Sequence, residues 1–123
     1  MSAGEYASAA VSEDPVAELR AHVRRFNDAV RSHDFSEMID GFAVEAEMAF
    51  DGVPVGPFVG REAIAAAYRD QPPDDEVRLL GAPRVQGEIV ESDYAWANDG
   101  RRAGRMILEA REGLIARLTI TFE

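Results

Sequence analysis

Two side chains in the middle of the chain, the carboxyl group of Asp51 and the phenol of Tyr68, have the chemistry for proton transfer on a small molecule. They begin and end the stretch DGVPVGPFVGREAIAAAY, in which a loop rich in glycine and proline leads into an alanine-rich helix. Proton transfer next to a carbonyl group needs one base within hydrogen-bond reach, in a dry pocket that raises its pKa towards neutrality. Val53, Val55 and Phe58 are close enough in sequence to create such a pocket around Asp51. We therefore predict that Asp51 and Tyr68 face one small-molecule pocket.

Both side chains also have a purely structural interpretation. Asp51 precedes Gly52, and an aspartate–glycine pair often starts a turn in which the carboxyl group bonds the nearby backbone. Tyr68 would serve equally well as a core residue whose hydroxyl group has one neighbour as its partner. Truncation of Asp51 to alanine separates the two interpretations, because the loss of a turn residue changes stability and leaves ligand binding unaffected.

Residues that bind metals or form covalent intermediates are scarce. The absence of cysteine excludes disulfides, thiolate nucleophiles and cysteine-ligated zinc. The two histidines, His22 and His33, lack the i, i+4 partner or carboxylate cluster of a metal site, and we expect both to be solvated. Arg105 and Glu109 lie on one side of a predicted strand, where we expect a surface ion pair facing away from the pocket. We predict no metal and no cofactor.

The composition indicates a single acidic globular domain. Of 123 residues, 46% are hydrophobic and 29% are charged, and the net charge of −10 opposes binding to nucleic-acid phosphates. No apolar run approaches the roughly 20 residues that span a bilayer, and the N-terminal segment lacks the features of a secretory signal. We expect a cytoplasmic protein that binds neither nucleic acid nor membranes.

Three helices are predicted in the first part of the chain. Residues 1–13 have no periodicity and are predicted to be a flexible tail before one domain over residues 14–123. Asp14 as N-cap and Pro15 at the first helical position predict the start of the first helix. Asp34 and Glu37 have capping-box spacing and predict a second helix, and a third follows Gly60 and ends before residue 72. The apolar stripe of the first helix is Val16, Leu19, Val23, Phe26 and Val30, and the buried face of the second is Phe35, Met38, Ile39 and Phe42.

Strands are predicted mainly in the second part of the chain. Residues 77–86, 89–97, 102–110 and 114–122 have strand length and composition and are separated by turn signals. A short strand is predicted at residues 47–50. Alternation places Met106 and Leu108, and likewise Leu114 and Leu118, on an apolar face that we expect to cover the helices, whereas Ile115 belongs to the mixed face. Because helices precede antiparallel strands, the predicted fold class is α+β.

The order of these elements and the segments FNDAVRSHDFSEMIDGF and FVGREAIAAAY resemble the nuclear transport factor 2-like superfamily, which includes ketosteroid isomerases and SnoaL-type polyketide cyclases. The resemblance covers nearly the whole chain from about Val16, so that residues 14–123 are similar to a ketosteroid isomerase-like or SnoaL-like domain. It implies a cystatin-like roll in which a cone-shaped, curved antiparallel sheet wraps around three N-terminal helices and leaves an apolar cavity open at the wide end. One fold hosts many sites, and the fold alone implies no activity.

The resemblance to ketosteroid isomerases implies positions for two site residues. Counting back from Gly60 places the general base at Asp51, whereas counting forward from Phe42 leads to Phe50. A shift of one residue along a strand moves a side chain to the other face. The tyrosine of the third helix in that family corresponds to Tyr68.

Two hydrogen-bond donors of the ketosteroid isomerase site have no counterpart here. The oxyanion-binding tyrosine falls on Phe26 and the protonated aspartate near Met106, so we do not expect efficient steroid isomerisation. The candidate replacements are Tyr68, Tyr94 and Trp96. Tyr94 and Trp96 are predicted to lie on different faces of one strand.

We expect a small apolar or polyketide-like molecule in the pocket and isomerase-like or cyclase-like chemistry with Asp51 as base. A non-catalytic ligand carrier and an interaction module that docks through its sheet face are the alternatives, and an open cone favours a ligand whereas a filled one favours the module. The resemblance also implies a homodimer through the outer sheet face. The predicted lining of the pocket is Phe26, Phe42, Phe50, Phe58, Trp96, Met106 and Leu108.

Overall fold

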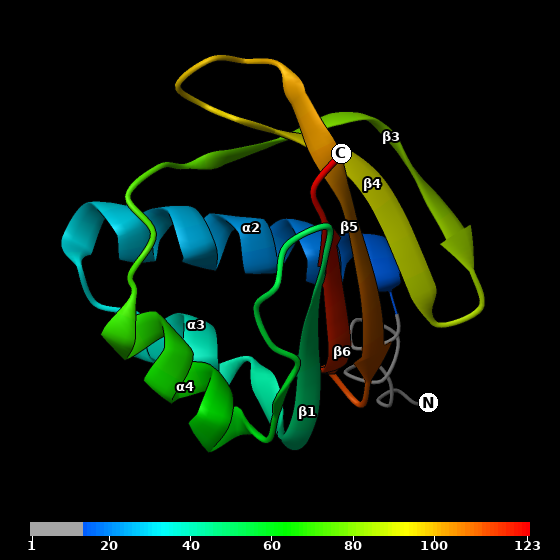
Figure 1. The fold of residues 1–123 in the computed structure, drawn as a ribbon. Helices are drawn as coiled ribbons and strands as arrows, with labels where there is room; N and C mark the ends of the chain where they lie inside the picture. Colours follow the sequence, from blue (N-terminus) through cyan, green and yellow to red (C-terminus); the bar gives the residue numbers. More distant parts are fainter. Residues whose placement is uncertain (1–13) are drawn as a thin grey trace.

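The computed structural model describes residues 14–123, in which three helices lie on one side of a six-stranded sheet (Figure 1). The predicted tail over residues 1–13 lies outside the described residues. The helices are α2 (Pro15–Ser32), α3 (Ser36–Asp40) and α4 (Arg61–Asp70). The strands are β1 (Phe42–Asp51), β2 (Phe58–Val59), β3 (Val77–Gln86), β4 (Ile89–Trp96), β5 (Arg102–Arg111) and β6 (Leu114–Thr121). The predicted α+β class is confirmed, and none of the described helices has the length and apolar character to cross a membrane.

Helix α2 starts as the sequence predicts and supplies much of the core. One carboxylate oxygen of Asp14 accepts hydrogen bonds from the backbone N–H groups of Val16, at 3.1 Å, and Ala17, at 3.4 Å. These bonds satisfy two of the backbone donors that a helix leaves free at its start. The predicted stripe is buried at Leu19, Val23 and Phe26, and the helix packs against β3, β4 and β5.

Helix α3 is shorter than predicted, because Asp34 forms a turn ahead of the helix. Its carboxylate accepts from the backbone N–H of Ser36, at 3.0 Å, and from the Ser36 hydroxyl group, at 2.7 Å, and Phe35 occupies the N-cap position. The helix ends at Asp40. Phe42, which the sequence places on its buried face, instead begins β1, which has 10 residues where residues 47–50 were predicted. Pairing with β6 overrides the local helical signal.

The sheet has the strand order β2-β1-β6-β5-β4-β3. Strand β1 runs parallel to β6, and all other neighbours are antiparallel. Strands β3, β4, β5 and β6 agree with the predicted ranges to within one residue at each end. Strands β1 and β6, which are far apart in the sequence, therefore lie side by side in the middle of the sheet.

The helix-facing side of the sheet follows the predicted alternation except at the β5–β6 turn. Met106, Leu108 and Leu118 are buried as expected. Leu114 is 37% exposed, however, and Ile115 is fully buried, which reverses their predicted faces. The β5–β6 pairing shifts register between residues 109 and 110, and an extra residue in one strand turns the following side chains to the other face.

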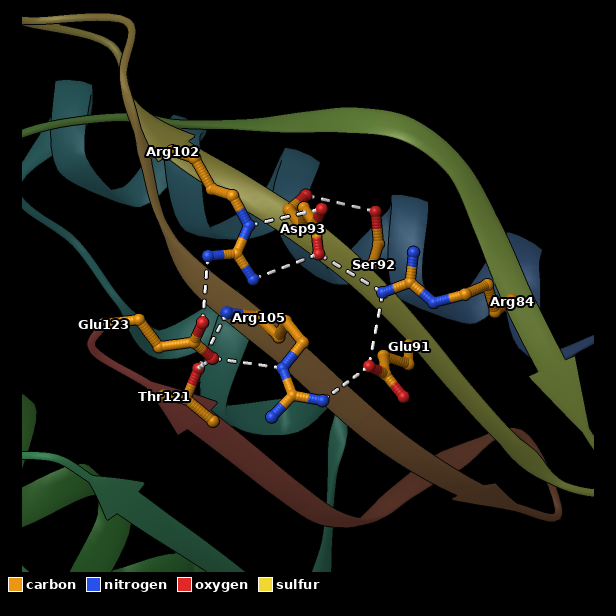
Figure 2. A network of polar contacts seen from close by, with 8 residues as sticks. All are labelled: Arg84, Glu91, Ser92, Asp93, Arg102, Arg105, Thr121 and Glu123. Atoms are coloured by element: carbon orange, nitrogen blue, oxygen red, sulfur yellow. Dashed lines mark hydrogen bonds and ion pairs between the residues drawn. The ribbon is translucent and has the colours of Figure 1, made fainter.

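The outer side of the sheet carries a network of ion pairs, shown in Figure 2, that joins Arg84, Glu91, Asp93, Arg102, Arg105 and Glu123. Arg105 and Glu109 both face outward as predicted, but they do not pair with each other. Arg105 binds Glu91 at 2.8 Å and Glu123 at 3.1 Å, whereas Glu109 binds Arg111 at 2.6 Å. Glu109 lies four residues further along β5, whereas Glu91 on the neighbouring β4 and Glu123 after β6 are within reach of Arg105.

Candidate functional site

A cavity of about 490 Å³ lies between the helices and the helix-facing side of the sheet. Strands β1, β4, β5 and β6, helices α2 and α4, and the loop after β1 all contribute to its wall. Lining residues deep in the cavity, such as Met48 and Met106, are buried, whereas Val55, Asp70 and Gln71 are exposed. The mouth is therefore formed by the loop after β1 and the end of α4.

Five of the seven predicted lining residues line this cavity. They are Phe26, Phe50, Phe58, Trp96 and Met106. The other two, Phe42 and Leu108, are completely buried and do not line it. Met106 pairs with Ile120, and both line the cavity, whereas Leu108, the next inward residue of β5, pairs with Leu118. The Leu108 side chain therefore fills the closed end of the cone.

Asp51 does not lie in the cavity. Its side chain is exposed, whereas the neighbouring Phe50 lines the wall together with Met48. Alternation along the strand places the two side chains on opposite faces. The pairing of β1 with β6 sets Phe50 beside Ile120 and Asp51 beside Thr121. The structure therefore does not bring Asp51 and Tyr68 together, and the count from Phe42, which led to Phe50, identifies the inward position.

Tyr68 lines the cavity from α4 and keeps a weakly bonded hydroxyl group. The ring stacks on Phe35 with a centroid distance of 5.3 Å. The hydroxyl group lies 3.8 Å from the sulfur of Met48, which is a poor acceptor. Burial raises the pKa of the phenol well above its usual value, so the group stays protonated. Its O–H is thus free to donate to an oxygen atom of a bound molecule.

Tyr94 and Trp96 share the cavity wall, and the prediction that they lie on different faces is wrong. Residues two apart on a strand point the same way, and the two rings meet edge to face at a centroid distance of 5.9 Å. The Tyr94 hydroxyl group donates to the backbone carbonyl of Thr121 at 3.0 Å. Burial raises the pKa of Tyr94 to about 12. The Tyr94 hydroxyl group is therefore engaged in a hydrogen bond within the fold, whereas the indole ring of Trp96 lines the cavity.

His22 is a cavity residue that the sequence-based interpretation missed. It is 2% exposed rather than solvated, lines the cavity, and meets the ring of Phe42 edge to face at 5.6 Å. Its Nδ1 atom is buried without a hydrogen-bond partner among residues 14–123. Burial, with a smaller contribution from Arg25, lowers the pKa of the imidazole to about 4 and keeps it neutral at pH 7. The helical spacing could have identified His22 as buried, since it continues the apolar stripe of the first helix, three residues after Leu19 and four before Phe26.

The residues from 14 onward contain no cluster of three or more metal-binding side chains. The polar groups that border the deep part of the cavity are His22, Tyr68, Tyr94 and Trp96. Such a set can bind and orient an oxygen-bearing apolar molecule by hydrogen bonds.

Comparison with known proteins places this architecture in a known fold. The sequence matches no protein-family model, and no curated protein matches it significantly. The structure is similar to an NTF-2 like protein of unknown function from Burkholderia xenovorans LB400, with a TM-score of 0.65, 19% identity, and 87% of this chain and 84% of that chain covered. The chain has the nuclear transport factor 2-like fold.

Two further solved structures to which the chain is similar are named for an isomerase activity. One is a candidate isomerase of the SnoaL-like family from Agrobacterium tumefaciens, with a TM-score of 0.67, 16% identity, and 92% of this chain and 98% of that chain covered. The other is a candidate ketosteroid isomerase from Kribbella flavida, with a TM-score of 0.58, 19% identity, and 87% and 78% covered. The predicted cystatin-like architecture is confirmed. A shared fold leaves the chemistry of the cavity to its lining residues.

Proposed function

We propose that the protein binds a small apolar molecule with a carbonyl or enol oxygen in the cavity and promotes isomerase-like or cyclase-like proton transfer on it. The single observation that carries the proposal is the open, mainly apolar cavity, in which the Tyr68 hydroxyl group has only a sulfur atom as partner. An interaction module would need no such space, because Phe26 and Trp96 would then fill it. They line the cavity instead.

The chemistry assigned to the cavity rests on hydrogen-bond donation. When a base such as the neutral His22 imidazole takes a proton from a carbon next to a carbonyl group, negative charge develops on the oxygen, and a donor already oriented towards it stabilises that charge. Tyr68 is buried and protonated, and is the donor best placed for this role. Asp51 has no part in the proposal, because its side chain is exposed and does not line the cavity.

Ligand binding can be followed through Trp96, which is the only tryptophan of the chain and lines the cavity. Titration with 2-decalone, a bicyclic ketone that does not absorb strongly where tryptophan does, should change its fluorescence to saturation. Tyr68→Phe should weaken binding about 5-fold, the usual effect of one lost hydrogen bond. Ala67→Phe, which places a ring in the cavity, should abolish binding. Asp51→Asn is the control and should bind as the wild type does.

Catalysis is tested separately with a Δ5-3-ketosteroid, whose isomerisation changes its ultraviolet absorbance. A slow rate above background that falls about 10-fold or more in Tyr68→Phe and is unchanged in Asp51→Asn would support proton transfer. If the protein binds such ligands but gives no rate above background, its function would be that of a carrier for the same class of ligand. Absence of binding by every ketone tested would overturn the proposal itself.

We also propose that two copies associate through the outer side of the sheet. The ion-pair network there contains three arginines and three carboxylates, so its formal charges cancel. Elsewhere the chain is strongly acidic, with a net charge of −10. A neutral face is the part of such a surface on which a second identical copy meets least repulsion.

A further inference from the structure

We propose that His22 determines which molecules the cavity accepts, and that the bound molecule carries a hydroxyl or enol group that donates a hydrogen bond to the His22 imidazole. The inference rests on the proposed function, since it names the chemical class of the ligand in the same cavity. It concerns a side chain on α2 that has no role in the implied isomerase site.

The position of His22 is the first observation. The ring is almost completely buried and lines the cavity together with Phe26, one turn further along α2. Phe42, which its ring meets edge to face, is itself completely buried and does not line the cavity. His22 therefore lies towards the closed end, where a ligand that enters past Val55 and Gln71 would place its far end.

The missing hydrogen bond is the second observation. A buried ring nitrogen without a partner costs about 1–3 kcal/mol of stability, and Nδ1 of His22 has none among the residues that the structure describes. A polar group on a bound molecule that reaches the imidazole would remove this penalty.

The chemistry of the other polar groups decides what that ligand group must be. Tyr68 and Trp96 line the cavity and carry an O–H and an N–H donor, and the Tyr94 hydroxyl group is already bonded to Thr121. A neutral imidazole has one nitrogen that carries hydrogen and one that accepts. His22 is thus the only strong side-chain acceptor deep in the described cavity wall. A ligand with both a carbonyl and a hydroxyl or enol group would satisfy Tyr68 and His22 together.

The test compares two probes that differ in a single hydrogen-bond donor, 2-decalol and its methyl ether, 2-methoxydecalin. Both keep the apolar ring system and an acceptor oxygen, but only the alcohol donates. Titrations followed through Trp96 fluorescence should show that the wild type binds the alcohol about 10-fold more tightly. His22→Leu should bind both probes with the affinity of the ether, and His22→Gln, which keeps an acceptor oxygen, should recover part of the preference.

The result that overturns this inference is equal affinity of the wild type for the two probes. In that case binding of both probes, together with its loss in Ala67→Phe, would leave the proposed function intact. If neither probe nor 2-decalone binds, the proposed function fails as well. Should His22→Leu not fold, the ¹⁵N chemical shifts of the His22 ring in the wild type provide the readout. They should move with the alcohol and not with the ether, and shifts that respond equally to both would count against the inference.

Discussion

At the scale of single residues, the chemistry of the protein depends on which polar side chains the fold moves out of water. Asp51 does not reach a molecule in the cavity, because its side chain lies on the surface. His22, by contrast, is enclosed by apolar groups and is held neutral. Its burial also affects stability, since the protonated form is disfavoured in the folded state.

The pH dependence of stability provides a test of this burial. The pKa of His22 is about 4 in the folded protein and about 6.5 when unfolded. Between these values the unfolded chain binds a proton that the folded chain does not, so the free energy of unfolding should fall as the pH is lowered from 6.5 towards 4. The full difference corresponds to about 3 kcal/mol. Urea denaturation at several pH values should show this slope in the wild type and a much smaller one in His22→Phe.

The ion-pair carboxylates titrate in a different range and act as an internal reference. The hydroxyl group of Thr121 and the two arginines Arg102 and Arg105 lower the pKa of Glu123 to about 2. The stability that Glu123 contributes is therefore complete above its unfolded pKa of 4.5 and is lost only as the pH falls towards 2. If wild type and His22→Phe lose stability in parallel between pH 6.5 and 4.5, the imidazole is not buried as described.

At the scale of elements, the cavity depends on how closely β4, β5 and β6 approach one another. Gly104 on β5 lies opposite Tyr94, and the carbonyl group of Thr121 on β6 occupies the place where a side chain of residue 104 would begin. The same carbonyl group accepts the hydrogen bond of Tyr94. The missing side chain at this position thus allows three strands to meet through one backbone oxygen.

Gly104→Ala should therefore destabilise the protein by about 2–4 kcal/mol, because the new methyl group overlaps with a backbone atom that cannot move independently. Gly41→Ala is the matched control. Gly41 has a helical φ of −76°, and the nearest atom to a Cβ there belongs to the flexible end of Arg25, at 2.9 Å. We expect this control to change stability by less than about 1 kcal/mol. Denaturant titrations of both variants decide the matter, and equal effects would contradict this account of the β4–β6 contact.

At the scale of the whole molecule, the two sides of the sheet have opposite characters. The inner side and the helices enclose the apolar cavity, whereas the outer side is covered by the ion-pair network and by the half-buried Ile107 and Thr119, which pair across β5 and β6. Figure 1 shows that the helices leave this outer side uncovered. Substitutions on the inner side should consequently change ligand binding, and substitutions on the outer side should change self-association.

Self-association through the outer side predicts a homodimer that Ile107→Glu converts to a monomer. A charge at this position would be buried without a partner in the dimer, which costs several kcal/mol. Ile107→Val, which keeps an apolar side chain, should remain dimeric. Sedimentation velocity at micromolar concentrations measures the change, and both variants should still bind 2-decalone. A wild type that remains monomeric throughout would exclude this interface.

Local signals in the sequence were sufficient for most elements and for much of the cavity wall. Asp14 and Pro15 start α2 because capping is a property of a few neighbouring residues. The bounds of β3 were predicted to the residue from turn signals and composition. Alternation along β5 and the choice of aromatic side chains were enough to identify Phe26, Trp96 and Met106 as lining residues.

Contacts between distant parts of the chain decided the remaining features. The parallel pairing of β1 with β6 took Phe42 out of a helix and placed Phe50, not Asp51, in the cavity. Packing of α2 on the sheet enclosed His22, and the register shift in β6 exchanged the faces of its first two residues. Periodicity and capping depend on neighbours a few residues away, whereas register and burial depend on partners that the chain meets only after it has folded.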